Sequence, residues 1–186
     1  KMKKQAFNPY LPSWEYIPDG EPRVFNERLY IYGSHDCFNG DVYCQNDYVC
    51  WSAPEDDLSD WRYEGVIFKK TQDPRNADGA HALWAPDVCQ GNDSKYYLYY
   101  SNAGDDTGGA VSARPDGPLV DARGQTPILP KGITPTNSYD PDILLPDEDD
   151  PNAYILFGSD WTDHYWAMQL DQNMIDVVPG TARKVP

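Results

Sequence analysis

The stretch DGEPRVFNERLYIYGS (residues 19–34) opens with an aspartate, continues through a short apolar run and ends in a tyrosine-containing strand closed by serine. Two later stretches repeat this order: DVCQGNDSKYYLYYS (residues 87–101) and DPDILLPDEDDPNAYILFGS (residues 140–159). The tyrosine-rich runs follow the opening aspartates by roughly 10 to 14 residues, a variation that one turn insertion explains. This repeat predicts a modular all-β protein.

Each module continues beyond its serine into a third strand-like run that ends in turn residues. These runs occupy residues 47–54, 108–118 and 164–171, and weaker fourth runs occupy residues 61–68 and 126–130. About four strands in some 50 to 70 residues is the size of a propeller blade. We therefore predict a single partial β-propeller with blades at roughly residues 17–75, 83–131 and 137–186.

The composition limits the class of protein further. The chain has 186 residues, of which 40% are hydrophobic, enough for one domain with a core. No window shows a sustained 3.6-residue apolar period, so helices should be few and short. No run approaches the roughly 20 apolar residues of a membrane span. The N-terminus carries lysines without a following apolar stretch, so we expect a cytoplasmic protein, with a mature secreted chain as the alternative.

Charge and cysteine content bear on partners and metals. The formal net charge of −15 would repel a phosphate backbone, which argues against nucleic acid as a partner. Calcium is the functional alternative for the acidic turn at residues 147–150, yet no D-x-[DN]-x-[DN]-G loop is present, and we expect no cofactor. The four cysteines form no C-x-x-C pair and no metal set with histidine, so free thiols are expected and a Cys44–Cys50 pairing stays open.

The opening aspartates carry the chemical prediction. In a propeller the first strand of every blade lines the central channel, so equivalent residues near its start approach one another. We expect Asp19, Asp87 and Asp140 to occupy that equivalent position. Carboxylates gathered in a partly desolvated cleft acquire different pKa values, which makes general acid and base roles available. This arrangement suits hydrolysis of a glycosidic bond.

Aromatic residues point to the same kind of ligand. The chain has 14 tyrosines and 6 tryptophans, and Trp84, in LWAPD, lies just before the second module's aspartate. Flat apolar rings with polar tips fit a pocket that binds amphipathic sugar rings, so we predict that Trp84 contacts substrate. His35 and Asp36, in GSHD, follow the first tyrosine strand and are either loop polar groups or part of the pocket lining.

In these motifs the chain resembles glycoside hydrolase family 43. Members of this family are five-bladed β-propellers that remove arabinofuranosyl or xylosyl units from plant polysaccharides with inversion of configuration at the anomeric carbon. The resemblance rests on PDGEPRVF…LYIYGSHD, LWAPDV…KYYLYYS and YDPDILLPDEDDPNAYILFGS. It implies that Asp19 is the general base, although Asp19-Gly20 replaces the usual Asp-Pro. It also implies that Asp140 orients the general acid and adjusts its pKa, and that Asp87 has a structural or pocket role.

The family's general acid is a glutamate of the fourth blade, and none of the six glutamates of this chain fits that position. The resemblance therefore implies that about three of five blades are present. A second chain or a segment outside this sequence would complete the ring and supply the acid. Two alternatives remain: a non-catalytic carbohydrate-binding module or inactive fragment, and a retaining propeller that acts on sucrose.

Overall fold

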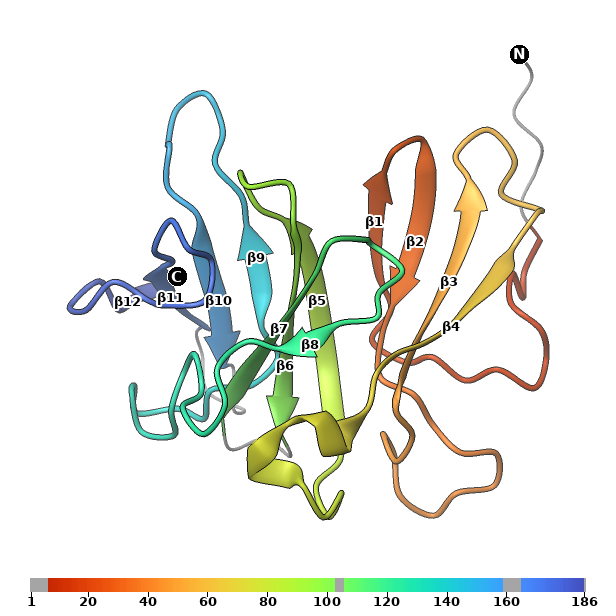
Figure 1. Cartoon of the computed structure of the whole chain (residues 1–186), viewed down its shortest axis with the longest axis horizontal. Helices are drawn as coiled ribbons and strands as arrows, with labels where there is room; N and C mark the ends of the chain where they lie inside the picture. Colours follow the sequence, from red (N-terminus) through yellow and green to blue (C-terminus); the bar gives the residue numbers. More distant parts are fainter. Residues whose placement is uncertain (1–6, 103–105, 159–164, 186) are drawn as a thin grey trace.

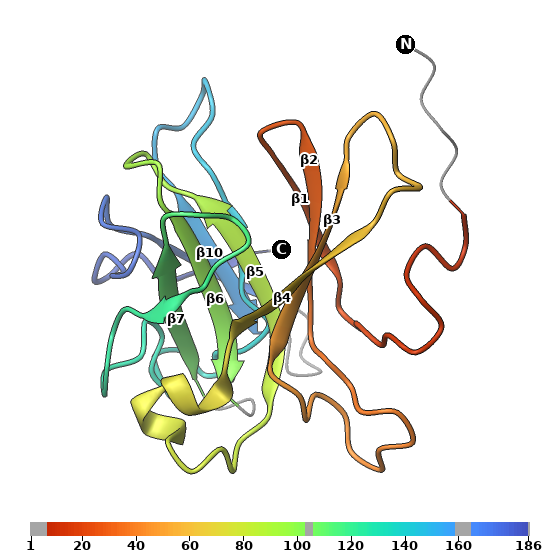
Figure 2. The same cartoon turned by 45° about the vertical axis from the view of Figure 1, so that its right-hand side comes forward.

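Three antiparallel sheets make up the molecule. The computed structural model describes residues 7–102, 106–158 and 165–185, and Ser159 and His164 of the predicted third module lie outside this part. Each sheet has four strands taken in chain order, and the three sheets stand side by side (Figures 1 and 2). They are blades of a β-propeller, so the predicted all-β class is confirmed.

The strands follow one another without exchange between sheets. Sheet 1 contains β1 (Glu21–Phe25), β2 (Arg28–Tyr32), β3 (Tyr48–Pro54) and β4 (Arg62–Phe68). Sheet 2 contains β5 (Leu83–Gln90), β6 (Tyr96–Asn102), β7 (Thr107–Ser112) and β8 (Val120–Asp121). Sheet 3 contains β9 (Asp142–Leu144), β10 (Tyr154–Gly158), β11 (Tyr165–Gln169) and β12 (Arg183–Val185). Two short 3₁₀ helices, η1 (Lys70–Gln72) and η2 (Pro74–Asn76), join sheets 1 and 2.

The outermost strand of sheet 2 differs from the prediction. The sequence suggested residues 126–130, whereas the fourth strand is Val120–Asp121. Residues 126–130 contribute only an isolated bridge between Thr107 and Leu129. Pro127 and Pro130 lack the backbone N–H that a strand ladder needs, which explains why this apolar run does not extend into a strand.

The core lies on both faces of sheet 2 because successive side chains of a strand point to opposite faces. Along β6, Tyr96, Leu98 and Tyr100 join the cluster shared with sheet 1. Tyr97 and Tyr99 join the cluster shared with sheet 3. Every residue of β6 is buried, so the dense tyrosine run of the sequence is the central strand of a sheet covered on both sides.

The inner strands β1, β5 and β9 come from different sheets but contact one another in turn. The outer face of sheet 1 is covered in part by the segment before β1, where the rings of Trp14 and Trp51 are 5.9 Å apart and those of Tyr10 and Trp61 are 5.2 Å apart. No helix of the described residues has the length and apolar character needed to cross a membrane.

Candidate active site

A three-residue motif marks each inner strand. Asp19-Gly20-Glu21 and Asp140-Pro141-Asp142 end on the first residue of β1 and of β9, and Ala85-Pro86-Asp87 lies within β5. The serines that close the tyrosine strands align these motifs. Ser34 Oγ accepts the N–H of Ala85 at 2.8 Å, and Ser101 Oγ accepts the N–H of Asp140 at 2.8 Å. Each serine thus binds the first motif position of the following sheet, which makes Ala85 and Asp140 equivalent.

The predicted equivalence of Asp87 with the other two aspartates is therefore wrong. Asp87 is the third motif position, and it faces Tyr99 across the ladder as Glu21 faces Tyr32. Both tyrosines stand two residues before their closing serine. Sheet 2 has Ala85 at the first motif position. The two acidic residues at this position are therefore Asp19 of sheet 1 and Asp140 of sheet 3.

Asp19 and Asp140 line the same pocket, which has a volume of about 340 Å³. The remaining lining residues are Glu21, Ala85, Pro86, Pro141, Asp142, Leu156 and Tyr165. Both aspartates have left-handed backbones, with φ of 54° and 50°, a conformation that non-glycine residues adopt mainly where the surroundings enforce it. Ser34 Oγ donates to Asp19 Oδ2 at 2.9 Å and fixes that carboxylate.

A glycine before the closing serine makes room for Asp19. A Cβ added to Gly33 would lie 2.4 Å from Ile17 Cγ2 and 2.7 Å from the carbonyl oxygen of Pro18, so the chain entering β1 passes directly over this glycine. Gly158 has the same place in sheet 3, and its N–H donates to the carbonyl of Tyr139, next to Asp140. Gly33 and Gly158 thus each contact the segment that carries the aspartate of their own sheet.

The pKa of Asp140 is higher than that of an ordinary aspartate. Loss of surrounding water and the negative charge of Asp19 raise the pKa of Asp140 to about 6. The pocket remains open to solvent, which screens part of this interaction. The pair therefore contains one carboxyl group that gains a proton near pH 6, as expected where two carboxylates share a site.

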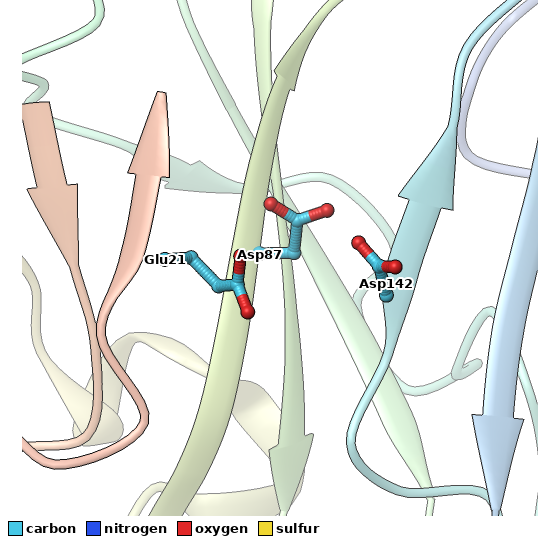
Figure 3. Close-up of side chains that lie close together, drawn as sticks. All are labelled: Glu21, Asp87 and Asp142. Atoms are coloured by element: carbon cyan, nitrogen blue, oxygen red, sulfur yellow. The ribbon is translucent and has the colours of Figure 1, made fainter. Parts of the chain in front are cut away.

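The residues at the third motif position, Glu21, Asp87 and Asp142, form a carboxylate triad. The carboxylate oxygens of Glu21, Asp87 and Asp142 include a set lying within 4.8 Å of one another, and the side chains come from three neighbouring strands (Figure 3). Burial, followed by the charges of Asp87 and Asp142, raises the pKa of Glu21. Burial also raises the pKa of Asp87, while hydrogen bonds from Arg23 oppose that rise.

The carboxylate triad offers oxygen ligands of the kind that calcium prefers. Arg23, however, already donates hydrogen bonds to Asp87 and Asp142, so a guanidinium takes up two of the three carboxylates. The residues present therefore fit a metal ion poorly.

Trp84 lies on β5 directly before Ala85 of the pocket lining. Its ring is 5.8 Å from that of Tyr43 and 6.3 Å from that of Tyr139, so it belongs to an aromatic group beside the pocket. The buried Nε1–H of Trp84 has no hydrogen-bond partner among the described residues. Its predicted contact with substrate stays a prediction.

His35 and Asp36 have partners away from the pocket lining. His35 Nε2 lies 2.8 Å from Glu15 Oε1 and His35 Nδ1 lies 2.9 Å from the carbonyl oxygen of Asp47. Asp36 Oδ1 accepts the N–H of Cys44 at 2.6 Å. These bonds order the loop after β2, and substrate contacts by either residue stay predictions.

A second pocket, of about 210 Å³, lies near the opposite ends of β5 and β9. Asp171 is the acidic residue of its lining, so it supplies no carboxylate pair. The four cysteines are free thiols.

Five residues of the site were not predicted from the sequence: Ser34, Ser101, Glu21, Asp142 and Arg23. The closing serine of each repeat was a signal for the first two. The acidic third position of the motif, present in all three modules, was a signal for the carboxylates. Arg23 had no such signal, because it occurs in one module alone.

Residues 18–185 match the family described as glycosyl hydrolases family 43. A xylosidase/arabinosidase of Thermoclostridium stercorarium is 73% identical over 99 residues, which are 53% of this chain and 21% of that protein. Xylosidase/arabinosidase 43A of Humicola insolens is 35% identical over 173 residues, which cover 87% of this chain and 49% of that protein.

A solved α-L-arabinofuranosidase from Clostridium thermocellum is similar in structure, with a TM-score of 0.69 and 31% sequence identity. The similarity covers 89% of this chain and 55% of that one. The chain thus spans about half the length, or less, of the relatives that it matches.

Proposed function

Because this chain belongs to glycosyl hydrolases family 43, we propose that it forms the base-carrying part of an inverting glycosidase that removes arabinofuranosyl or xylosyl units from plant polysaccharides or oligosaccharides. The observation that carries the proposal is the Asp19–Asp140 pair in one open pocket, each residue on a left-handed backbone. The names of the matched relatives, xylosidase/arabinosidase, support this choice of sugars.

In the proposed reaction Asp19 takes a proton from a water molecule, and the oxygen of that water attacks the anomeric carbon. A glutamate from outside this sequence donates a proton to the departing glycosidic oxygen, so protons and charge balance. The two carboxyl groups would stand about 6.5 to 9.5 Å apart, leaving room for the water. Asp140 would orient the glutamate and hold its pKa high enough for it to act as an acid.

Substitution of the base in the complete protein tests this proposal. Asp19→Asn should lower kcat on an aryl arabinofuranoside or xyloside by orders of magnitude, since an amide cannot accept the water proton. Asp149→Asn, in an exposed turn, is the matched control and should leave kcat unchanged. A loss below tenfold for Asp19→Asn would remove Asp19 from the base role.

Product stereochemistry is a second measurement. NMR of the first product formed should show the inverted anomer of arabinose or xylose. Release of the retained anomer would favour the sucrose-type retaining alternative. Binding of the sugar without hydrolysis would favour a carbohydrate-binding module.

A further inference from the structure

Arg23 connects the inner strands of all three sheets. From β1, its Nε donates to Asp87 Oδ1 at 2.9 Å and its Nη2 donates to Asp87 Oδ2 at 2.5 Å. The same Nη2 lies 3.1 Å from Asp142 Oδ1 on β9. One guanidinium therefore joins residues that are 64 and 119 positions away in the sequence.

Asp87 extends this connection through the backbone. Its Oδ2 accepts the N–H of Ile143 on β9 at 2.8 Å, and its Oδ1 accepts its neighbour's N–H, that of Val88, at 2.6 Å. The Asp87 side chain is 0% exposed, whereas that of Arg23 is 28% exposed. Removing the cation of a buried ion pair is strongly destabilising, so the Asp87 carboxylate depends on this guanidinium.

The geometry of the Asp19–Asp140 pair depends on the same bonds. Asp19 stands two residues before Glu21, where β1 begins, and Asp140 stands two residues before Asp142, where β9 begins. These two strands belong to different sheets, so no strand ladder sets their separation. The Arg23 bridge to Asp142 spans that gap directly.

We propose that Arg23 is a positioning residue. Its guanidinium, bound to carboxylates of β5 and β9, fixes the separation of β1 and β9 and sets the charge around the carboxylates of the pocket. The effect of Arg23 on kcat rests on the function proposed above. Its effect on the pKa values of the carboxylates can be measured without catalysis, so one proposal can be wrong while the other holds.

Kinetics of the complete protein provide the first test. Arg23→Met should lower kcat roughly 10- to 100-fold and change KM less than about threefold, because misplaced catalytic groups slow the chemical step more than they weaken binding. Arg23→Lys should lie between wild type and Arg23→Met, since an ammonium cannot form the fork that binds two carboxylates. Arg62→Met, which removes an arginine exposed on β4, is the control and should retain wild-type kcat.

A double variant separates positioning from folding. Arg23→Met leaves the buried Asp87 carboxylate without its cation, whereas Arg23→Met with Asp87→Asn removes that carboxylate as well. We expect the double variant to recover most of the lost thermal stability but not the lost kcat, because the bridge between β1 and β9 remains broken. Recovery of wild-type kcat by the double variant would overturn the positioning role.

Carbon-13 NMR titration of the Asp and Glu carboxyl groups provides a readout that needs no activity. Burial, followed by the charges of Asp87, Asp142 and Asp19, raises the pKa of Glu21, and the charge of Arg23 lowers it. Arg23→Met should therefore move the Glu21 titration to higher pH, and Arg62→Met should not. An unchanged Glu21 titration, or a variant that loses thermal stability alone with kcat unchanged, would overturn the proposal. If the wild-type protein hydrolyses no glycoside, the proposed function fails and the titration still decides the role of Arg23.

Discussion

At the scale of single residues, the pocket joins two carboxyl groups of unequal character. Asp19 is held by Ser34, whereas the pKa of Asp140 is raised to about 6 by loss of surrounding water and by the charge of Asp19. An aspartate in an unfolded chain titrates near 3.9. Asp140 therefore binds its proton more tightly in the folded protein than in the unfolded one.

This difference predicts how Asp140→Asn changes stability with pH. A raised folded-state pKa contributes stability below the unfolded-state value, and that contribution is lost as the pH rises towards 6. We compare the Tm of Asp140→Asn with that of wild type at pH 4 and at pH 8. The difference, variant minus wild type, should be a few degrees larger at pH 8 than at pH 4. Thermal unfolding at both pH values measures this, with Asp149→Asn as the control. An equal Tm difference at pH 4 and pH 8 would contradict the assigned shift.

At the scale of elements, the end of β2 positions the inner strand of its own sheet and that of the next sheet. Gly33 lets the chain before β1 pass close to β2, and Ser34 holds both Asp19 and the backbone of Ala85. In sheet 2 Tyr100 replaces this glycine and its hydroxyl donates to the buried Asp73. The sheet without the glycine is also the sheet without the first-position aspartate.

The close approach at Gly33 predicts a large effect of one methyl group. In Gly33→Ala the added Cβ would overlap Ile17 and Pro18, so the segment that carries Asp19 must move. We expect a loss of kcat of at least tenfold in the complete protein, measured with the same aryl glycoside.

Gly124→Ala is the control for a glycine substitution that causes no steric overlap. Gly124 has φ of 62° and an added Cβ there meets nothing within 4 Å, so this variant should lose about 1 kcal/mol of stability and keep its kcat. If Gly33→Ala behaves like Gly124→Ala, the glycine does not position Asp19.

At the scale of the whole molecule, the two faces of sheet 3 differ. One face contributes Ile143, Ile155 and Phe157 to the core shared with sheet 2. On the other, Leu144 is 56% exposed and Tyr165 is 49% exposed. Sheets 1 and 2 pack through a core of the same kind, so the open face of sheet 3 has the character of a surface that a further blade covers.

This open face predicts the solution behaviour of a chain limited to these 186 residues. Such a chain should bind the dye ANS, which reports exposed apolar surface. Leu144→Thr should reduce that binding by more than Val120→Thr, because Val120, although 59% exposed, lies on the outermost strand of sheet 2. Equal effects of the two substitutions would show that the dye does not favour the open face.

The sequence by itself determined the repeat and the order of the first three strands of each blade. These features depend on local alternation and on turn residues, which each segment carries whatever its neighbours are. The location in the cytoplasm stays a prediction.

Only the tertiary structure decided that Ala85 is the equivalent of Asp19, that Asp87 belongs to the carboxylate triad, and that Arg23 joins the inner strands. Asp87 pairs with Tyr99 as Glu21 pairs with Tyr32, so the ladder places the second aspartate at the third motif position and not at the first, as the repeat had suggested. Bonds across 64 and 119 residues exist only after the sheets pack, so no local pattern encodes them. The sequence thus identified the blades, and their packing determined which acidic side chains meet.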